Sequence, residues 1–196
     1  MQSNSPYANK ELTNEIAILS SVFWDNFCSC EFCHGLFQRK KQENPMPQSL
    51  AQIYLHIVFS TKHRQPYFRD DAFANELHAY LAGICKKQDC FPKHIGGHVD
   101  HVHLLCSLSR RKTVAELIRE LKTGSSTWIK TRKKEWEDFH WQDGYAAFSV
   151  SQSQLQNVKE YINNQIEHHR TRTFQDEFRK LLEMHSLEFD EKYVWD

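Results

Sequence analysis

The order of strand-like and helix-like segments is the feature that most constrains what this chain can fold into. Residues 53–60 form a run of β-branched and aromatic residues that is typical of a strand. A helical pattern follows over residues 70–87, then two strand patterns over residues 91–99 and 101–108, a helical pattern from Thr113 and a fourth strand over residues 145–150. This β-α-β-β-α-β order predicts an α+β, ferredoxin-like fold, an antiparallel sheet with helices on one face followed by C-terminal helices.

The first two helical patterns have recognisable start signals. Asp70 or Asp71 suits the N-terminus of the first helix, because a short acidic side chain accepts a hydrogen bond from a free backbone N–H. Thr113 and Glu116 have the spacing of a capping box at the start of the second. Gly124 and the two serines after it predict a kink or interruption there, before a helical segment over residues 128–136.

A last helical pattern covers residues 153–169, with Ser153 and Gln156 as its expected capping pair. Tyr161 and Gln165 lie one turn apart, at the edge of the apolar stripe and therefore at the boundary between core and solvent. Taken singly, each is also compatible with an ordinary packing or surface role. The stripe expected to face a core consists of Leu155, Val158, Ile162 and Ile166.

The strand pattern over residues 101–108 carries His101 and His103. Side chains alternate between the faces of a strand, so these two imidazoles project from one face and Val102 from the other. Two imidazoles on one face of a rigid strand can share a metal ion. Half-buried histidines give the same spacing, and the chain contains 12 histidines, so the spacing alone leaves both interpretations open.

Together these segments resemble a known family. The His-Val-His run at residues 101–103 and the Tyr-Ile-Asn-Asn-Gln run at residues 161–165 resemble the HUH signature and nucleophile helix of the single-tyrosine transposases of small bacterial insertion sequences. These are the IS200-like transposases, whose relatives include the REP-associated tyrosine transposases. The resemblance covers residues 46–196, and further similar segments lie at 53–62, 141–145, 147–151, 168–169 and 193–196.

The resemblance implies an enzyme that cleaves and rejoins single-stranded DNA at insertion-sequence ends. It implies that Tyr161, on a C-terminal nucleophile helix, forms a 5′-phosphotyrosine intermediate without ATP. It also implies a divalent ion, Mg²⁺ or Mn²⁺, held by His101, His103 and Gln165. His168, seven positions beyond Tyr161, is a possible auxiliary ligand or proton acceptor.

Other polar residues near the histidine pair are expected to play supporting roles. His98 and Asp100 suit a turn or the orientation of a liganding imidazole, and His169 is not expected to be a primary ligand. Two alternative functions remain open. A metal-dependent phosphodiesterase would use the histidines but not Tyr161, and a catalytically inactive hairpin-DNA-binding module would use neither for chemistry.

The formal net charge is zero, which argues against indiscriminate duplex binding, but basic residues gather around the second helix. In the family, hairpins at the element's ends are recognised, so these residues are candidate phosphate contacts, with Trp128, Trp136 or Phe139 to stack on unpaired bases. A solvated helical face is the alternative. The candidates are Arg110, Arg111, Lys112, Arg119, Lys122, Lys130, Arg132, Lys133 and Lys134.

The rest of the chain indicates its organisation. Residues 1–45 are expected to be an N-terminal extension, poorly ordered or translated from upstream sequence, and residues 46–196 the transposase domain. No apolar run reaches the roughly 18 residues needed to span a membrane, and a cytoplasmic location is expected. The resemblance further implies a homodimer, in which the tyrosine helix serves either the partner's histidines or those of its own subunit. The acidic C-terminal segment is expected to pack on the domain or restrain it.

Overall fold

The computed structural model describes residues 50–195, and the predicted boundary at residue 45 lies outside them. Four antiparallel strands form one sheet in the order β2-β3-β1-β4. This order and connectivity confirm the predicted ferredoxin-like plan. The strands are β1 (Tyr54–Ser60), β2 (Pro92–His98), β3 (His101–Ser107) and β4 (Ala146–Val150).

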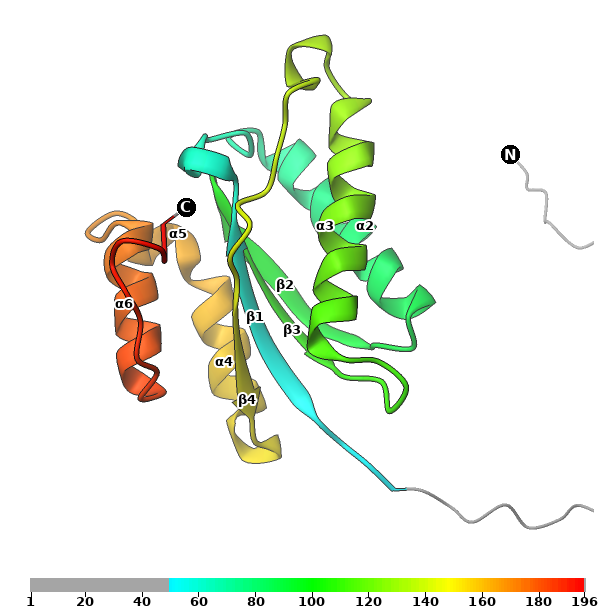
Figure 1. Cartoon of the computed structure of the whole chain (residues 1–196), viewed down its shortest axis with the longest axis vertical. Coiled ribbons are helices and arrows are strands. Elements are labelled where there is room, and N and C mark those ends of the chain that lie inside the picture. Colours follow the sequence, from blue (N-terminus) through cyan, green and yellow to red (C-terminus); the bar gives the residue numbers. More distant parts are fainter. Residues whose placement is uncertain (1–49, 196) are drawn as a thin grey trace, which may run out of the picture. The chain divides into compact units, whose positions relative to one another are not determined.

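Helices cover both faces of the sheet (Figure 1). The helices α2 (Asp71–Lys87) and α3 (Val114–Lys130) pack on one face, as predicted. The C-terminal helices lie on the opposite face, and they are α4 (Leu155–Asn163), α5 (Gln165–His168) and α6 (Phe174–Met184). No helix within residues 50–195 is long and apolar enough to cross a membrane.

Strand β1 is buried along its whole length because it lies inside the sheet, between β3 and β4. Ile57 and Phe59 belong to the core under α2 and α3, whereas Val58 belongs to the core under α6. Directly opposite residues of an antiparallel pair share a face, and His103 pairs with Val58. Both histidines of β3 therefore project toward the C-terminal helices, as the alternation predicts.

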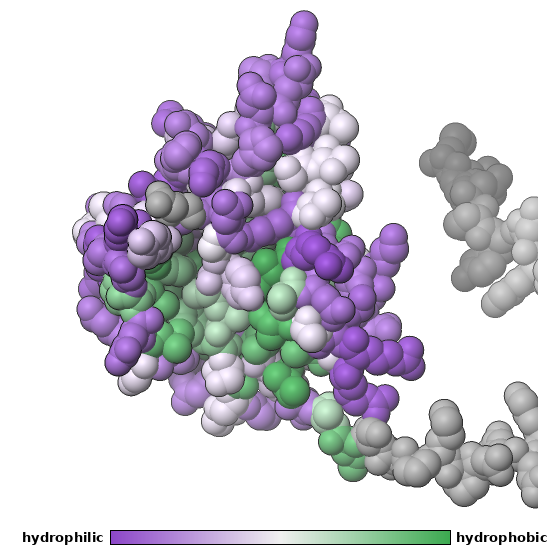
Figure 2. Space-filling model, viewed as in Figure 1, coloured by the Kyte–Doolittle hydropathy of each residue, from purple (hydrophilic) through white to green (hydrophobic). Residues whose placement is uncertain are grey.

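The space-filling view shows how the apolar residues that remain at the surface are distributed on one side of the molecule. Hydrophobic residues gather over the middle of this face, whereas hydrophilic residues cover its periphery (Figure 2). Strand β4 is an edge strand of the sheet, so one side of its backbone is not paired with another strand of residues 50–195.

Two local predictions about α3 have opposite outcomes. The capping box of Thr113 and Glu116 is present. The interruption expected at Gly124 is wrong, because α3 continues to Lys130 and packs Gly124 closely against Ile84. Only a short 3-10 helix over Lys134–Trp136 follows, so the helix expected over residues 128–136 is also wrong.

The continuous helix expected over residues 153–169 is wrong. A 3-10 turn (Gln152–Gln154) precedes α4, the Ser153 hydroxyl bonds Ser151 instead of capping the helix, and the helix is broken at Asn164. The apolar stripe does not continue beyond this break. Ile166, expected in the core, is 62% exposed, whereas Gln165 is only 1% exposed.

The approach of α4 to β2 depends on a residue without a side chain. A Cβ atom added at Gly96 would lie 2.7 Å from Ile162 Cγ2 and 3.1 Å from the Ile162 carbonyl oxygen. Ile162 follows Tyr161 in α4, so this close contact fixes the distance of Tyr161 from the sheet.

We expect Gly96→Ala to lower the free energy of unfolding by about 1–3 kcal/mol, because the backbone oxygen of Ile162 can move away only with α4. Gly83→Ala is the matched control. Gly83 lies inside α2 with nothing within 4 Å of an added Cβ, so it should raise stability by about 0.5–1 kcal/mol. Urea denaturation measures both, and equal stability of the two variants would contradict the close packing of α4 on β2.

Candidate active site

His101 and His103 are fully buried on the face of β3 that the C-terminal helices cover. One nitrogen of each ring faces the same carboxylate: His101 Nε2 lies 3.7 Å from Glu177 Oε2, and His103 Nε2 lies 3.7 Å from Glu177 Oε1. His103 Nε2 has no hydrogen-bond partner among the described residues. A buried nitrogen without a partner is costly, so this atom is a candidate to bind a ligand.

The other nitrogen of each ring, Nδ1, contacts a neighbouring side chain. Asp100 Oδ1 lies 2.7 Å from His101 Nδ1, where an orienting carboxylate was expected. His56 Nε2 lies 3.0 Å from His103 Nδ1, and the two rings stack with their centroids 5.2 Å apart. Burial lowers the pKa of His56 to about 3, so its ring is neutral at pH 7. With each Nδ1 engaged, the Nε2 lone pairs are directed into the site.

Tyr161 and Gln165 reach the same place from the other side. The Tyr161 hydroxyl donates a hydrogen bond to Glu177, and Gln165 Nε2 donates to Glu177 Oε1 over 2.8 Å. Gln165 Oε1 lies 3.4 Å from His101 Nε2. Burial and the charge of Glu177 raise the pKa of Tyr161 above its ordinary range. The structure therefore brings the four predicted site residues together within one chain.

Glu177 was missed by the sequence analysis. Burial alone would raise its pKa, but contacts with His103 and His169 lower it well below the ordinary range, so the carboxylate is ionised. The signal was present: Glu177 shares one helical stripe with the apolar residues Phe174, Phe178 and Leu181. A carboxylate on the buried stripe of an amphipathic helix needs specific partners.

His169 also belongs to the site, although it was not expected to be a ligand. Its Nε2 lies 2.9 Å from Glu177 Oε2, 3.1 Å from Gln165 Oε1 and 3.2 Å from His101 Nε2. Burial opposes protonation, but the hydrogen bond with Glu177 raises the pKa of His169 overall. His168, the predicted auxiliary residue, lies instead beside the Tyr161 ring, with 5.1 Å between centroids.

The donor atoms fit a divalent metal ion. Ligand atoms of His101, His103 and Glu177 lie within 4.8 Å of one another, and all three residues are buried. The amide oxygen of Gln165 points at the same space. Imidazole nitrogens with carboxylate and amide oxygens form a mixed set that accepts magnesium, manganese or later transition metals. An ion at this position would also provide a partner for His103 Nε2.

A cavity of about 440 Å³ adjoins this cluster, between α4 and α6. Tyr161 and Glu177 line it, so the hydroxyl of the expected nucleophile is next to a space that a ligand can enter. Its other walls come from the 3-10 turn before α4, from α4 itself, and from α6 and the loop that precedes it.

The nine predicted DNA contacts do not behave as one group. Lys122 Nζ donates hydrogen bonds to the carbonyl oxygens of Gln142, Asp143 and Gly144, and burial lowers its pKa to about 8. Lys122 is therefore occupied within the protein. Arg132 is similarly engaged, in an ion pair with Glu76.

The predicted stacking residues also differ in their surroundings. Trp136 and Phe139 belong to the core under α2 and α3, so the prediction that they stack on bases is wrong. Trp128 is half-buried and lies between the rings of Phe73 and Tyr80, with which it stacks. Aromatic residues that looked available in the sequence are used for internal packing.

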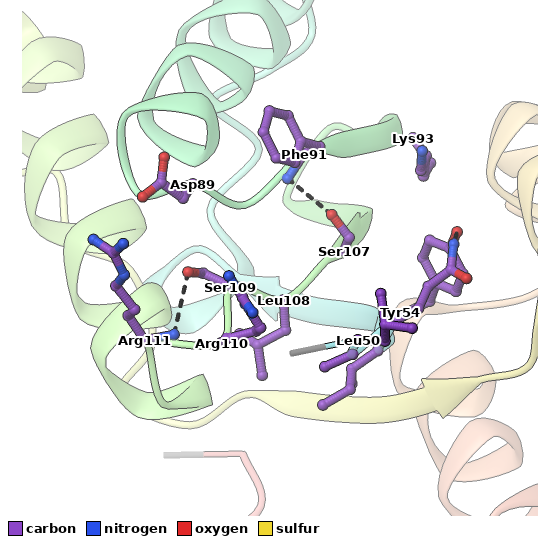
Figure 3. A pocket seen from close by; sticks show the side chains of 13 residues that line it. Leu50, Tyr54, Asp89, Phe91, Lys93, Ser107, Leu108, Ser109, Arg110 and Arg111 are labelled. Atoms are coloured by element: carbon purple, nitrogen blue, oxygen red, sulfur yellow. Dashed lines mark hydrogen bonds between the residues drawn. The ribbon is translucent and has the colours of Figure 1, made fainter. Parts of the chain in front are cut away.

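Arg110 and Arg111 line a second cavity, of about 740 Å³. Arg111 and Asp89 lie on one side of it, Lys93 on the other, and Phe91 between them (Figure 3). Phe91 is 57% exposed. This cavity lies at the end of the sheet where Tyr54 pairs with Ser107, whereas His101 pairs with Ser60 at the other end. Six residues of strand separate the two ends, or roughly 20 Å.

Comparisons with known proteins identify the family. The family model described as "Transposase IS200 like" matches residues 49–165, which include both histidines of β3, Tyr161 and Gln165. No curated protein matches the chain.

Two solved structures are similar to part of the chain. A candidate transposase from Deinococcus radiodurans R1 is 21% identical, with a TM-score of 0.48 over 61% of this chain and 95% of that one. A REP-associated tyrosine transposase bound to a REP hairpin is 10% identical, with a TM-score of 0.48 over 63% of this chain and 73% of that one. The family model matches more than half of this chain, so the chain belongs to the family of IS200-like transposases.

Proposed function

We propose that this protein cleaves and rejoins single-stranded DNA at insertion-sequence ends, with Tyr161 as the nucleophile. The observation that carries the proposal is the position of the Tyr161 hydroxyl. It is hydrogen-bonded to the Glu177 carboxylate, in a cavity wall next to two buried histidines with converging nitrogens. A tyrosine that served only for packing would not require a buried, ionised partner.

In this reaction the Tyr161 oxygen attacks the phosphorus of a phosphodiester, and the bond from phosphorus to the 3′-oxygen breaks. Glu177 accepts the hydrogen bond of the phenol and so fixes the position of the attacking oxygen. The products are a 5′-phosphotyrosine and a free 3′-OH, and the proton lost by the phenol balances the one that the leaving oxygen gains. One phosphoester replaces another, so a 3′-OH can reverse the step without ATP.

We propose that a divalent ion, Mg²⁺ or Mn²⁺, is held by His101, His103 and Gln165, with Glu177 within reach of the same space. When bound, such an ion supplies Lewis-acid chemistry to phosphate and leaving-group oxygens. His56 and Asp100 hold the two imidazoles in the required orientation.

The first test is covalent capture. The wild-type protein, mixed with labelled single strands from the DNA that flanks its own gene and with Mn²⁺ or Mg²⁺, should give a protein–DNA band that survives denaturation. Tyr161→Phe should abolish the band, because the ring remains but the attacking oxygen is lost. Tyr80→Phe is the matched control, since Tyr80 lies on α2 and contacts Trp128 instead of the site.

Two outcomes would favour the alternatives. Strand cleavage that survives Tyr161→Phe would identify a metal-dependent phosphodiesterase that uses the histidines and water. Tight hairpin binding by the wild-type protein with no covalent product, for any strand or either metal, would identify a catalytically inactive binding module.

The second test measures metal binding directly. We expect His101→Ala and His103→Ala to lose most Mn²⁺ affinity in a calorimetric titration, because each removes a ligand. His56→Ala should weaken Mn²⁺ by roughly 10–100-fold, since it frees the His103 ring to turn. His94→Ala, a partly exposed histidine of β2 outside the cluster, is the control. Unchanged Mn²⁺ affinity in both ligand variants would overturn the proposed metal site.

We propose that the partner is single-stranded DNA with hairpin ends, which would place the protein in the cytoplasm. Lys93, Arg110 and Arg111 surround the second cavity together with the exposed ring of Phe91 (Figure 3). Cations for phosphates and an exposed ring for an unpaired base are the features that bind such DNA. Of the predicted basic residues, Arg110 and Arg111 have the strongest support.

We expect Arg111→Ala, combined with Phe91→Ala, to weaken hairpin binding about tenfold or more in a fluorescence anisotropy titration. The salt slope, which is the magnitude of the slope of log affinity against log salt concentration, should also fall by about one for the lost phosphate contact. Arg119→Ala, on the exposed side of α3, is the comparison. If Arg119→Ala lowered the hairpin affinity and the Arg111→Ala/Phe91→Ala variant did not, the interface would lie on α3 instead.

The homodimer with shared sites stays a prediction. Strand β4 is an edge strand that can pair with another chain, which supports a dimer. The tyrosine and the histidines meet within one chain, with 5.9 Å between the ring centroids of Tyr161 and His103. A single chain therefore holds a complete set of site residues.

A further inference from the structure

The cavity between α4 and α6 is lined by polar side chains that the proposed chemistry at Tyr161 does not use. Its walls carry two cations, Arg172 and Lys180, and two side-chain amides, Gln154 and Asn157. Its volume of about 440 Å³ lies in the range of pockets that hold a small ligand. A duplex does not fit a space of this size, whereas one unpaired nucleotide does.

The two cations lack acidic partners within residues 50–195. Arg172 and Lys180 are exposed, and neither side chain takes part in an ion pair there. Their neighbours differ, since Arg170 pairs with Glu167 and Arg179 pairs with Asp176 and Glu191. Glu167, Asp176 and Glu191 are therefore paired with other arginines, whereas Arg172 and Lys180 have no ion pair within residues 50–195 and can bind an anion from outside.

Arg172 and Tyr161 line the same cavity. An anion bound by Arg172 in this cavity would share the space into which the Tyr161 hydroxyl opens. Lys180 lies on α6, one residue before Leu181, and extends the cationic wall along the same cavity.

The remaining walls suit a nucleobase. Asn157 Nδ2 donates to Gln154 Oε1 over 2.8 Å, which leaves the oxygen of Asn157 and the amino group of Gln154 for an external partner. An acceptor beside a donor matches the edge of a base. Val158, Leu181 and the exposed Met184 supply apolar surface against which the base can stack.

We propose that this cavity binds the nucleotide whose 5′-phosphate Tyr161 attacks, with Arg172 and Lys180 on backbone phosphates and with Gln154 and Asn157 on the base. The inference rests on the proposed function and adds a subsite to it. The bound nucleotide stays joined to the protein through phosphotyrosine after cleavage, so the same contacts keep its 5′ end in place while a new 3′-OH enters.

The experiment uses the double variant Arg172→Ala/Lys180→Ala in the Tyr161→Phe protein, so that binding is measured without chemistry. The probes are a hairpin with a single-stranded extension, from DNA flanking the gene, and the same hairpin without the extension. For the extended probe we expect affinity to fall about tenfold or more, and the salt slope to fall by about 1.4 for two single-strand phosphate contacts. Binding of the bare hairpin should not change.

Three controls keep the result interpretable. Arg170→Ala removes a nearby positive charge outside the cavity and should keep the full salt slope. Arg172→Lys/Lys180→Arg keeps both charges and should restore the slope. The urea midpoint of the double alanine variant should equal that of its parent, because neither side chain has an internal ion pair to lose.

An unchanged slope for the extended probe, or an equal loss of affinity for both probes, would overturn the subsite. Failure of the proposed function looks different: the wild-type protein would form no covalent band with any strand. The binding measurements do not depend on cleavage, so each idea can fail alone.

Discussion

The buried carboxylate of Glu177 is the interaction on which the site depends. Moving an ion from water into a protein interior costs several kcal/mol unless hydrogen bonds and opposite charge compensate it. Here the hydroxyl of Tyr161, the amide of Gln165 and the ring of His169 all contact the carboxylate. Each of them belongs to the chain before α6, so docking of α6 and placement of the tyrosine are energetically coupled.

The sheet supplies the other half of the site through a purely local rule. Alternation along β3 directs His101 and His103 to one face, and pairing with β1 adds His56 to the same face, behind His103. The sequence could predict the histidine pair because side chains alternate between faces along any strand, whatever its tertiary contacts. It could not predict His56, because the pairing of β1 with β3 joins residues 47 positions apart.

The tyrosine helix shows where periodicity fails as a guide. The 3.6-residue pattern places Ile166 in the core and Gln165 at its edge, yet the helix breaks at Asn164 and the two exchange places. The contacts of Gln165 with Glu177 and His169 are made only in the folded chain, and they favour burial of Gln165 over burial of Ile166. The basic residues show the same limit of sequence analysis. Lys122 and Arg111 look alike in sequence, but Lys122 is hydrogen-bonded within the protein, whereas Arg111 lines a cavity.

An ionised carboxylate beside the proposed nucleophile raises a question of charge, because a phosphodiester is itself an anion. Burial lowers the pKa of His103 to about 4, so this imidazole contributes no positive charge at pH 7 to offset Glu177. A phosphate that approached Tyr161 would be repelled unless cations accompanied it. Three groups could supply this positive charge: the proposed divalent ion at the histidines, His169, whose pKa the hydrogen bond with Glu177 raises, and Arg172 with Lys180 of the cavity wall. The carboxylate that assembles the site thus makes compensating positive charge a requirement for an anionic substrate.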